Sequence, residues 1–598
     1  MGKINDILSP FTAWKHLFNE PLSVKDPLNR EAADRYRGFH INNLDKCIGC
    51  GTCEEICQNA AIDLVFVAGI ETKNGDSGLR PKIDYGRCCW CALCVDICTT
   101  NSLGMSNKYT WVDEDSDNFR FIPGVDKKAW DNCEKGWKKP TANYQLYNLN
   151  QVKMHEIAPE ARDKSFIEII HGYSKEQALL EADRCVGCGI CIAACPAHMG
   201  IPEYIKAIRN DNLKDGLKIL YDTNPLPEIC GRICTHKCET VCSLGHTGDA
   251  ISIRWLKRYI ADQNTLEEYK KILGTENIEK NGKKVAIIGS GPSGLSAAHY
   301  LSLMGYSCTI FERFPEAGGM MRYGIPEYRL PYDQLDKDID YIVSLGTEIR
   351  YNTTIGKDIT LNDLHNQYDA VFAGTGLHLG RSTKIPGSEN KNVYQSIDLL
   401  RDIVLGKGIP VAEKIVVIGG GNVAMDITRS LARLQNQKYG KVNILATSLE
   451  SEEQMPADKE EIIEAREEKA LIMPGWGPIS IEIKDNQVTG LNVVKCLTVF
   501  DEESRFNPKF DENQKNFFAA DMIVESIGQG MDLSYISTEI KELLAMDNRG
   551  RIIVDKNFQS NVKWLFVGGD IIQGPDVIHG IANGHKAAIG IDSFIKNK

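Results

Sequence analysis

The sequence predicts a multidomain protein of mixed α/β and α+β class, 598 residues long. Two observations predict this class: four cysteine-dense blocks come first, and two glycine-rich loops follow, each preceded by a short apolar run typical of a buried strand. A chain of this length with 42% apolar and 25% charged residues can bury several cores. We therefore expect cysteine-rich domains ahead of two α/β domains.

The composition excludes several classes of function. A formal net charge of −12 argues against broad binding to nucleic acid or anionic membranes, since both require a basic surface. No apolar run is long enough to span a bilayer, so we expect no integral membrane protein. Twenty cysteines without a secretory leader predict a cytoplasmic location and free thiols. Partners are expected to be proteins or small nucleotides.

The first two cysteine blocks have the spacing of a bacterial two-cluster ferredoxin. The pattern C-x2-C-x2-C-x3-C occurs at Cys47, Cys50, Cys53 and Cys57, and again at Cys88, Cys91, Cys94 and Cys98. In this signature each fourth cysteine binds the other cluster, which predicts the ligand sets Cys47/Cys50/Cys53/Cys98 and Cys88/Cys91/Cys94/Cys57. Zinc is the alternative, but zinc sites usually split their ligands into two separated pairs. Residues 41–110 therefore form a predicted 2x[4Fe-4S] ferredoxin domain.

Residues 1–110 resemble the two-cluster ferredoxin subunit of respiratory complex I and related hydrogenases, through residues 14–18, residues 35–40 and the cysteine blocks. The resemblance implies electron transfer to another subunit. A helical apolar spacing, interrupted by Pro10, runs through Ile4, Ile7, Leu8, Phe11, Trp14 and Phe18. Residues 1–40 are therefore either a docking arm or a segment that packs on the ferredoxin core. Residues 111–165 are a predicted connecting segment with some packed turns.

A second cysteine region predicts a helical iron-sulfur domain at residues 166–275. Its cysteines are Cys185, Cys188, Cys191 and Cys195, then Cys230, Cys234, Cys238 and Cys242. From this region to the C-terminus the chain resembles the small subunit of glutamate synthase and the matching half of dihydropyrimidine dehydrogenase, through Asn224-Pro225-Leu226-Pro227 and the following Cys230–Cys234 segment. The resemblance implies one cluster on Cys185, Cys188, Cys191 and Cys242. It implies another on Cys195, Cys234 and Cys238, with Cys230 outside the ligand set.

The second of these inner clusters has no evident fourth ligand. The resemblance implies a glutamine or glutamate on the helix after the last cysteine, and alignment puts Lys257 at that place. A protonated lysine has no lone pair to offer iron. Either Cys230 supplies the fourth ligand, another group moves in to supply it, or the cluster is altered or missing. The expected total is three to four [4Fe-4S] clusters.

The first glycine loop, residues 289–294, lies within a predicted βαβ unit. The unit consists of a strand at 285–288, a helix at 296–304 and a strand at 308–311. Gly289 permits the tight turn, Gly291 lets a pyrophosphate approach and Gly294 lets helix and strand pack closely. Glu312, at the end of the second strand, can bind a ribose hydroxyl. The resemblance assigns FAD to this unit, with further contacts from Gly319, Gly569 and Asp570. It forms a domain of residues 276–383 and 528–598.

The second glycine loop lies within another predicted βαβ unit, in an inserted domain at residues 384–527. Its βαβ pattern has a strand at 415–418, the loop residues Gly419, Gly421 and Ala424, a helix to residue 434 and a strand at 442–446. The resemblance makes it the Rossmann-like nicotinamide domain, in which relatives that use NADPH place two arginines after this strand to grip the 2′-phosphate. Here Leu449 and Glu450 stand there, and a carboxylate favours a free ribose hydroxyl, which predicts NADH over NADPH. The alternative is that Glu450 belongs to a solvated acidic loop.

These parts predict an NAD(P)H-dependent FAD and iron-sulfur oxidoreductase without a side-chain acid, base or nucleophile. NADH exchanges a hydride with FAD, and single electrons pass through the clusters to or from ferredoxin or a partner subunit of an anaerobic complex. One alternative is the small subunit of a glutamate synthase that uses NAD(P)H. Another is a non-catalytic electron-carrying scaffold.

Overall fold

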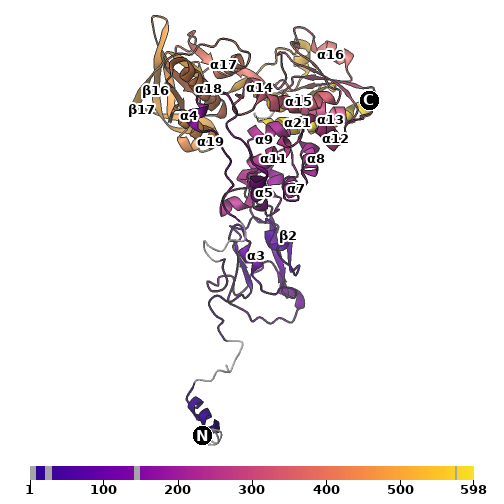
Figure 1. The fold of residues 1–598 in the computed structure, drawn as a ribbon, viewed down its shortest axis with the longest axis vertical. Coiled ribbons are helices and arrows are strands. Elements are labelled where there is room, and N and C mark those ends of the chain that lie inside the picture. The colour runs from indigo at the N-terminus through magenta and orange to yellow at the C-terminus, as the bar shows by residue number, and fades with distance from the viewer. Residues whose placement is uncertain (1–8, 20–29, 140–147, 573–575) are drawn as a thin grey trace. The chain divides into compact units, whose positions relative to one another are not determined.

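The structure is a computed structural model, and it describes residues 9–19, 30–139, 148–572 and 576–598 (Figure 1). The chain divides into two compact units. The first comprises residues 1–150, 186–190 and 241–250, and the second comprises residues 151–185, 191–240 and 251–598. Each unit is described by itself. None of the described helices is long and apolar enough to cross a membrane.

The first unit contains two small antiparallel sheets. Its elements are η1 (Ser9–His16), β1 (His40–Asn42), α2 (Thr52–Glu55), β2 (Ile62–Phe66), β3 (Leu79–Asp84), α3 (Leu93–Asp96), β4 (Leu103–Met105), η3 (Ser116–Phe119), β5 (Arg120–Phe121) and η4 (Ser243–His246). β1 pairs with β4, and β3 lies between β2 and β5. The short helices α2 and α3 each lie within one cysteine block, so the sheets frame the two predicted cluster loops.

Part of the predicted connecting segment belongs to this core. Trp130 is buried and stacks on Phe39 with ring centroids 4.4 Å apart, while Trp111 packs edge-on against both. β5 also adds a strand to β3. The prediction from sequence differed because these aromatic residues show no periodic spacing, although burial of their large rings stabilises a small domain.

The predicted N-terminal arm is only partly described. Ile4, Ile7 and Leu8 lie outside the described residues. Residues Ser9–His16 form the 3-10 helix η1, and the side chains of Phe11, Trp14 and Phe18 are exposed.

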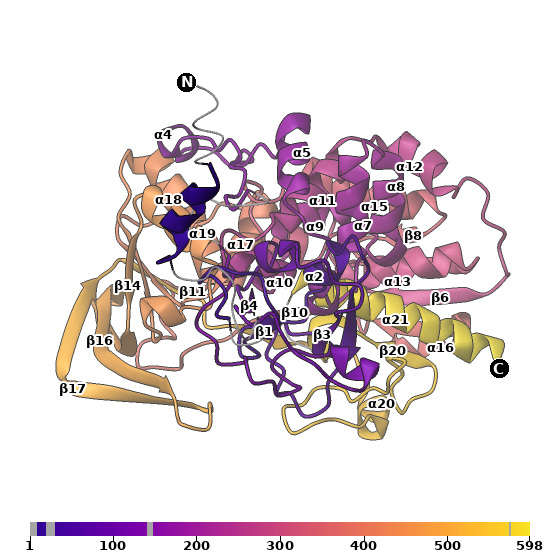
Figure 2. The same cartoon turned by 90° about the horizontal axis from the view of Figure 1, so that it is seen from below.

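The second unit begins with a helical domain. Its helices are α4 (Pro159–Arg162), α5 (Lys175–Asp183), α6 (Ile190–Ala194), α7 (Ile201–Arg209), α8 (Leu213–Thr223), α9 (Pro227–Ile233), α10 (Lys237–Thr240), α11 (Ile253–Asp262) and α12 (Leu266–Leu273). α9 packs closely on α11, because a Cβ built on Gly231 would lie 2.8 Å from the Cα of Arg258. Helices α8, α11, α12 and α15 lie side by side in Figure 2. α9 ends at Cys234, which has an extended conformation.

The FAD domain has a parallel sheet in the order β20–β9–β6–β7–β8. Its elements are β6 (Lys284–Ile288), α13 (Pro292–Leu303), β7 (Ser307–Phe311), α14 (Met320–Tyr323), α15 (Tyr332–Ser344), β8 (Glu348–Arg350), α16 (Leu361–Gln367), β9 (Ala370–Ala373), α20 (Thr538–Leu543), β20 (Leu565–Val567), η6 (Gly569–Ile571) and α21 (Val577–Lys596). Strands β6, β7, β9 and β20 are mostly apolar and buried, as parallel strands covered by helices are, whereas the edge strand β8 is largely exposed. α13 packs against α21 and starts at Pro292, earlier than predicted, because proline fits the first helical turn.

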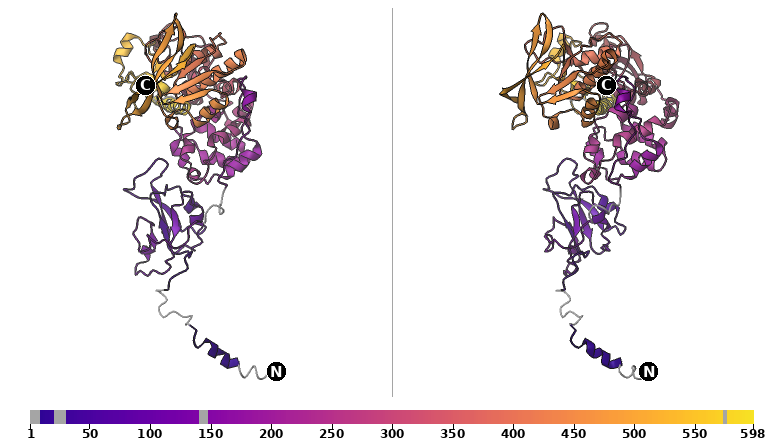
Figure 3. Two further views of the ribbon diagram at one scale, coloured as in Figure 1. Left: turned by 90° about the vertical axis from the view of Figure 1, so that its left-hand side faces the viewer. Right: turned by 60° about the vertical axis from the view of Figure 1, so that its left-hand side comes forward.

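The inserted domain has a second parallel sheet in the order β11–β18–β12–β13–β14. Its elements are β11 (Val393–Gln395), α17 (Ser396–Val404), β12 (Ile415–Ile418), α18 (Asn422–Tyr439), β13 (Ile444–Ser448), η5 (Glu452–Gln454), α19 (Lys459–Glu467), β14 (Leu471–Pro474), β15 (Trp476–Lys484), β16 (Gln487–Phe500), β17 (Phe506–Ala519) and β18 (Met522–Glu525). The antiparallel strands β15, β16 and β17 stand out as long orange arrows in Figure 3. Two strands, β10 (Leu377–Gly380) and β19 (Gln529–Met531), pair where the chain enters and leaves this insertion.

These domains confirm the fold class predicted from the sequence: a ferredoxin-type domain, a helical iron-sulfur domain and two Rossmann-like domains.

Candidate functional site: a nucleotide cleft beside an iron-sulfur domain

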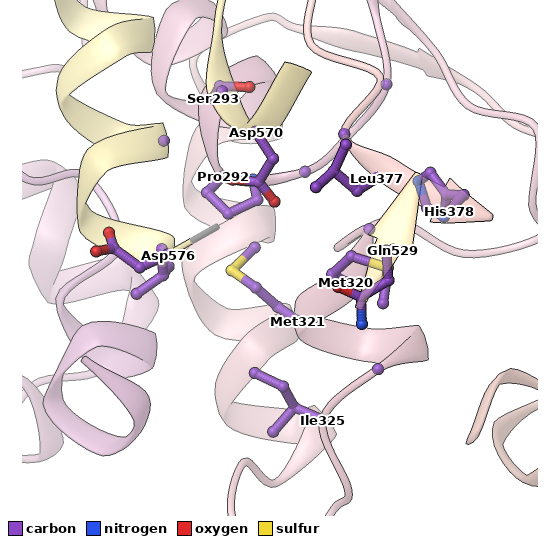
Figure 4. Close-up of a pocket in the computed structure, with 18 of the residues that line it drawn as sticks. Pro292, Ser293, Met320, Met321, Ile325, Leu377, His378, Gln529, Asp570 and Asp576 are labelled. Atoms are coloured by element: carbon purple, nitrogen blue, oxygen red, sulfur yellow. The ribbon is translucent and has the colours of Figure 1, made fainter. Parts of the chain in front are cut away.

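One cleft in the second unit is lined by three parts of the chain (Figure 4). It has about 1190 Å³ of free space, part of it open to solvent. The FAD domain supplies the predicted residues Gly289, Gly291, Glu312, Gly319, Gly569 and Asp570. The inserted domain supplies Asn422 and Val423, the first residues of α18. The helical domain supplies Ile233 and Thr235, which flank Cys234.

The glycine loop after β6 fits a dinucleotide. Gly289 has φ +94°, a conformation that favours glycine, and a Cβ there would lie 2.7 Å from the Gly374 carbonyl oxygen. A Cβ on Gly294 would lie 2.0 Å from the Gly289 carbonyl oxygen, which explains why this glycine packs the helix and does not line the cleft. A Cβ on Gly291 would meet nothing within 4 Å and would enter the cleft itself. The space beside Gly291, at the start of α13, is where a helix N-terminus can receive a pyrophosphate.

Two carboxylates line this part of the cleft. Glu312 is buried, and its Oε2 accepts a hydrogen bond of 3.0 Å from the Ser290 backbone N–H, while Oε1 accepts one of 2.9 Å from the Phe314 N–H. It is thereby held beside the glycine loop, as a ribose-binding acid requires. The second carboxyl is that of Asp570, whose pKa is raised to about 7 by burial and, to a lesser extent, by the charge of Asp576.

Residues next to the second glycine loop line the same cleft. Gly419, Gly421 and Ala424 do not line it, but Gly421 caps the start of α18, whose first residues do. Glu450 follows β13, and its Oε2 lies 3.1 Å from a Cβ built on Gly420. The carboxylate is therefore next to the loop where a second dinucleotide would bind.

Several lining residues were missed from the sequence. The segment Thr375–His378 after β9 and Gln529 at the start of β19 line the cleft. The run Gly374-Thr375-Gly376 after a buried strand could have indicated the first of these. Gln529 carries no local signal, because its strand is defined only by pairing with β10, far earlier in the chain.

A buried ion-pair network joins the inserted domain to the FAD domain near the cleft. Arg329 Nη1 donates to both carboxylate oxygens of Asp426 on α18, and its Nε lies 2.7 Å from Glu461 Oε1 on α19. Arg429 on α18 in turn pairs with Glu461 and Glu468. Arg329 and Asp426 both line the cleft. Removing one partner of such a buried pair leaves an uncompensated charge, so this network fixes how the two domains meet.

The predicted cluster loops share a backbone conformation. In each of three cysteine blocks, two residues have positive φ. One is the second residue after the first cysteine, and the other directly follows the second cysteine. These residues are Gly49 and Gly51, Trp90 and Ala92, and Gly187 and Gly189. Trp90 and Ala92 adopt this conformation although they are not glycine, which L-residues do rarely. A backbone that alternates between left- and right-handed residues turns successive N–H groups toward one side, an arrangement found at many iron-sulfur sites. The eight ferredoxin cysteines therefore lie on loops that fit two clusters.

Hydrogen bonds to the thiols support this fit. Cys50 Sγ lies 3.2 Å from Thr52 Oγ1, and Cys98 Sγ lies 3.4 Å from Ser102 Oγ. The hydroxyl of Ser102 contributes to lowering the pKa of Cys98, against the effect of burial. Among the described residues, no three His, Cys, Asp or Glu side chains are grouped as around a single metal ion.

The sequence predicts two ligand sets among the inner cysteines. Of the first, Cys185 and Cys191 belong to the second unit, while Cys188 and Cys242 belong to the first, where Cys188 Sγ lies 3.4 Å from Ser243 Oγ. The second predicted set, Cys195, Cys234 and Cys238, lies wholly in the second unit, which also contains the buried residues Cys230 and Lys257. A hydrogen bond from Cys230, aided by the charge of Lys257, lowers the pKa of Cys234 to about 6, against the effect of burial. Burial lowers the pKa of Lys257, but the surrounding thiols raise it above the ordinary value.

Three family models match the chain. A pyridine nucleotide-disulphide oxidoreductase model matches residues 283–587, a dihydropyrimidine dehydrogenase domain II, 4Fe-4S cluster model matches residues 162–269, and a 4Fe-4S binding domain model matches residues 41–63.

Individual relatives cover different shares of the chain. The NADP(+)-dependent formate dehydrogenase subunit beta of Moorella thermoacetica is 35% identical over 431 residues, which cover 68% of this chain and 60% of the relative. The NADPH glutamate synthase small chain of Escherichia coli is 31% identical over 476 residues, 76% of this chain and 99% of the relative. AegA of Escherichia coli is 28% identical over 597 residues, 92% of this chain and 86% of the relative.

Proposed function

Because this chain belongs to the pyridine nucleotide-disulphide oxidoreductase family and carries a dihydropyrimidine dehydrogenase-type iron-sulfur domain, we propose that it is the NADH-linked electron-transfer subunit of a larger oxidoreductase. Electrons would pass between NADH and the clusters, to or from ferredoxin or a partner subunit. The match to a glutamate synthase small chain confirms that predicted resemblance, and the match to the 4Fe-4S binding domain confirms a ferredoxin motif in the first unit.

One observation carries this proposal: a single cleft is lined by the FAD-domain loop, by the first residues of α18 and by both neighbours of Cys234. A bound FAD supplies the conversion, since it accepts a hydride from a nicotinamide and gives single electrons to iron-sulfur clusters. The residues of the chain position the FAD and the nicotinamide nucleotide. The loop at Gly291 leaves space for the pyrophosphate, Glu312 is held for the ribose, and the Arg329–Asp426 pair sets the second nucleotide domain against the first.

The preference for NADH rests on Glu450. Its carboxylate lies beside Gly420, and a carboxylate repels a 2′-phosphate but can accept hydrogen bonds from a free ribose hydroxyl. The formate dehydrogenase and glutamate synthase relatives are named for NADP(H), so this residue would set the chain apart from them.

A partner is proposed on two grounds. The relatives are named as a subunit beta and a small chain, and the chain spans 60% of the length of the first. The ferredoxin-type unit offers two further clusters beyond those of the helical domain, which suits transfer to another protein.

Anaerobic diaphorase assays on the full chain test the function, with NADH and NADPH compared at equal concentration. We expect kcat/KM for NADH to exceed that for NADPH by about tenfold, because one repulsive carboxylate is worth about 1.4 kcal/mol at partly exposed sites. Absorbance at flavin and cluster wavelengths should fall together on reduction. No reduction by either nucleotide would refute the proposed function, and a clear preference for NADPH would refute the part that rests on Glu450.

A further inference from the structure

The inner site around Lys257 offers three well-placed thiols and one cation. Cys234 leaves the end of α9 in extended conformation, and His236, two residues later, has positive φ as in the ferredoxin loops. Cys238 follows on α10, and Cys195 comes from the end of the preceding block. Lys257 is buried on α11, and the next residue, Arg258, packs against Gly231 near the end of α9, so the lysine lies close to the helix end that carries Cys234.

Cys230 differs from the other cysteines in this set. It sits inside α9, where its N–H donates to the Leu226 carbonyl at 2.9 Å, and its side chain is fully buried. Cys195 and Cys234 each directly follow the end of a helix, and Cys238 lies in the first turn of α10. Cys230, in contrast, is held within α9, one turn before Cys234. We therefore place Cys230 outside the ligand set, as a buried neighbour of the ligand Cys234.

Lys257 is held at this place by helix packing. The contact of Gly231 with Arg258 brings α9 and α11 close together one residue away from Lys257. The lysine side chain is 4% exposed, so its head group cannot reach bulk solvent. An ammonium has three donors and no lone pair, and it therefore supplies positive charge where a fourth iron would need a ligand.

We propose that this site holds a [3Fe-4S] cluster on Cys195, Cys234 and Cys238, with the Lys257 ammonium at the corner that a fourth iron would occupy in a cubane. Three thiolates provide one protein ligand for each of three irons. Loss of a ferrous ion makes a cluster more negative, and a buried cation beside it offsets part of that charge. The donor set thus does not fit a fourth ligated iron.

This inference rests on the proposed function only in requiring iron-sulfur clusters in the helical domain. The proposed cluster type and the proposed function can be contradicted separately, because electron paramagnetic resonance identifies the cluster type without any nicotinamide. An oxidised [3Fe-4S] cluster is paramagnetic, whereas an oxidised [4Fe-4S] cluster is diamagnetic.

The test uses the full chain, purified without oxygen and oxidised with thionine. We expect an oxidised three-iron signal of about one spin per chain and about fifteen irons rather than sixteen. Incubation with ferrous iron and a thiol reductant rebuilds a cubane that has lost iron by damage. The native signal should survive this treatment, and its disappearance would contradict the proposal, as would its absence from the start.

Variants at Lys257 and Cys230 separate the role of the buried cation from that of the neighbouring thiol. Lys257→Glu supplies a carboxylate ligand and should abolish the oxidised signal with a gain of about one iron, while Lys257→Met should retain the signal. Cys230→Ala should also retain the signal, because the three ligands remain in place. Loss of the cluster in Cys230→Ala, at unchanged FAD content, would show that Cys230 is a ligand and would overturn the proposal. An unchanged signal in Lys257→Glu, again at unchanged FAD content, would also overturn it.

Discussion

Arg329 of the FAD domain holds Asp426 of the inserted domain with one guanidinium nitrogen, at 2.9 and 2.8 Å from the two carboxylate oxygens. The residues are 97 positions apart, and both line the nucleotide cleft. Asp426 lies on the first turns of α18, directly after the second glycine loop. The pair therefore links the position of one nucleotide loop to the wall of the other.

Removing this link should slow hydride transfer more than it weakens binding. In Arg329→Met the buried Asp426 loses its partner and the two domains lose their fixed alignment. Since small misplacements of reacting groups cost about 100-fold in rate, we expect flavin reduction at saturating NADH to fall about 10- to 100-fold, with less than about threefold change in Kd. Stopped-flow absorbance measures both quantities.

The matched control is Arg350→Met, which breaks a surface pair with Glu348 in the same domain. It should leave the rate within about twofold, because exposed ion pairs contribute little. Equal rates of flavin reduction in Arg329→Met and the wild type would contradict a positioning role for Arg329.

Charge reversal at Glu450 should change the nucleotide preference. Glu450→Arg places a guanidinium beside Gly420, where it can pair with a 2′-phosphate, so kcat/KM for NADPH should rise about tenfold relative to NADH. Glu453→Arg, three residues further along the same acidic run, is the control and should leave the ratio unchanged. A similar shift in both variants would mean that general surface charge, and not Glu450, sets the preference.

A methyl group at Gly291 tests the flavin site without disturbing the apoprotein. A Cβ there meets no protein atom within 4 Å, yet it enters the cleft. Gly291→Ala should fold with an unchanged melting temperature before FAD is added and should bind FAD at least about tenfold more weakly. Gly408→Ala, also free of contacts, is the control for both measurements. Full FAD occupancy in Gly291→Ala would show that the pyrophosphate does not lie at this loop.

The affinity for FAD should depend on pH through Asp570. Its pKa of about 7 in the cofactor-free protein means that the carboxyl is mostly neutral at pH 6 and mostly ionised at pH 8. An ionised carboxylate repels the pyrophosphate, so Kd for FAD should rise about three- to tenfold from pH 6 to pH 8. Asp570→Asn should flatten this dependence in a fluorescence titration. A steep pH dependence that persists in the variant would assign it to another group.

The sequence revealed those parts of the site whose residues lie close together along the chain. Cysteine spacing predicted the cluster loops because three ligands come from one short segment, and the glycine loops were evident because strand, loop and helix are consecutive. The Arg329–Asp426 pair could not be predicted, since it depends on how two domains pack. The burial of Trp130 in the ferredoxin core was also hidden, because an irregular aromatic segment has no periodicity to interpret.

The cleft at Cys234 is central to the proposed function, because both neighbours of this residue line the nucleotide site. The most direct measurement is anaerobic stopped-flow reduction by NADH of the wild type and Cys234→Ser, monitored separately for flavin and for the ferredoxin-domain clusters. We predict that flavin bleaches at a similar rate in both, while reduction of the ferredoxin-domain clusters slows at least about tenfold in the variant. Cluster reduction at the wild-type rate in Cys234→Ser would contradict transfer through this site.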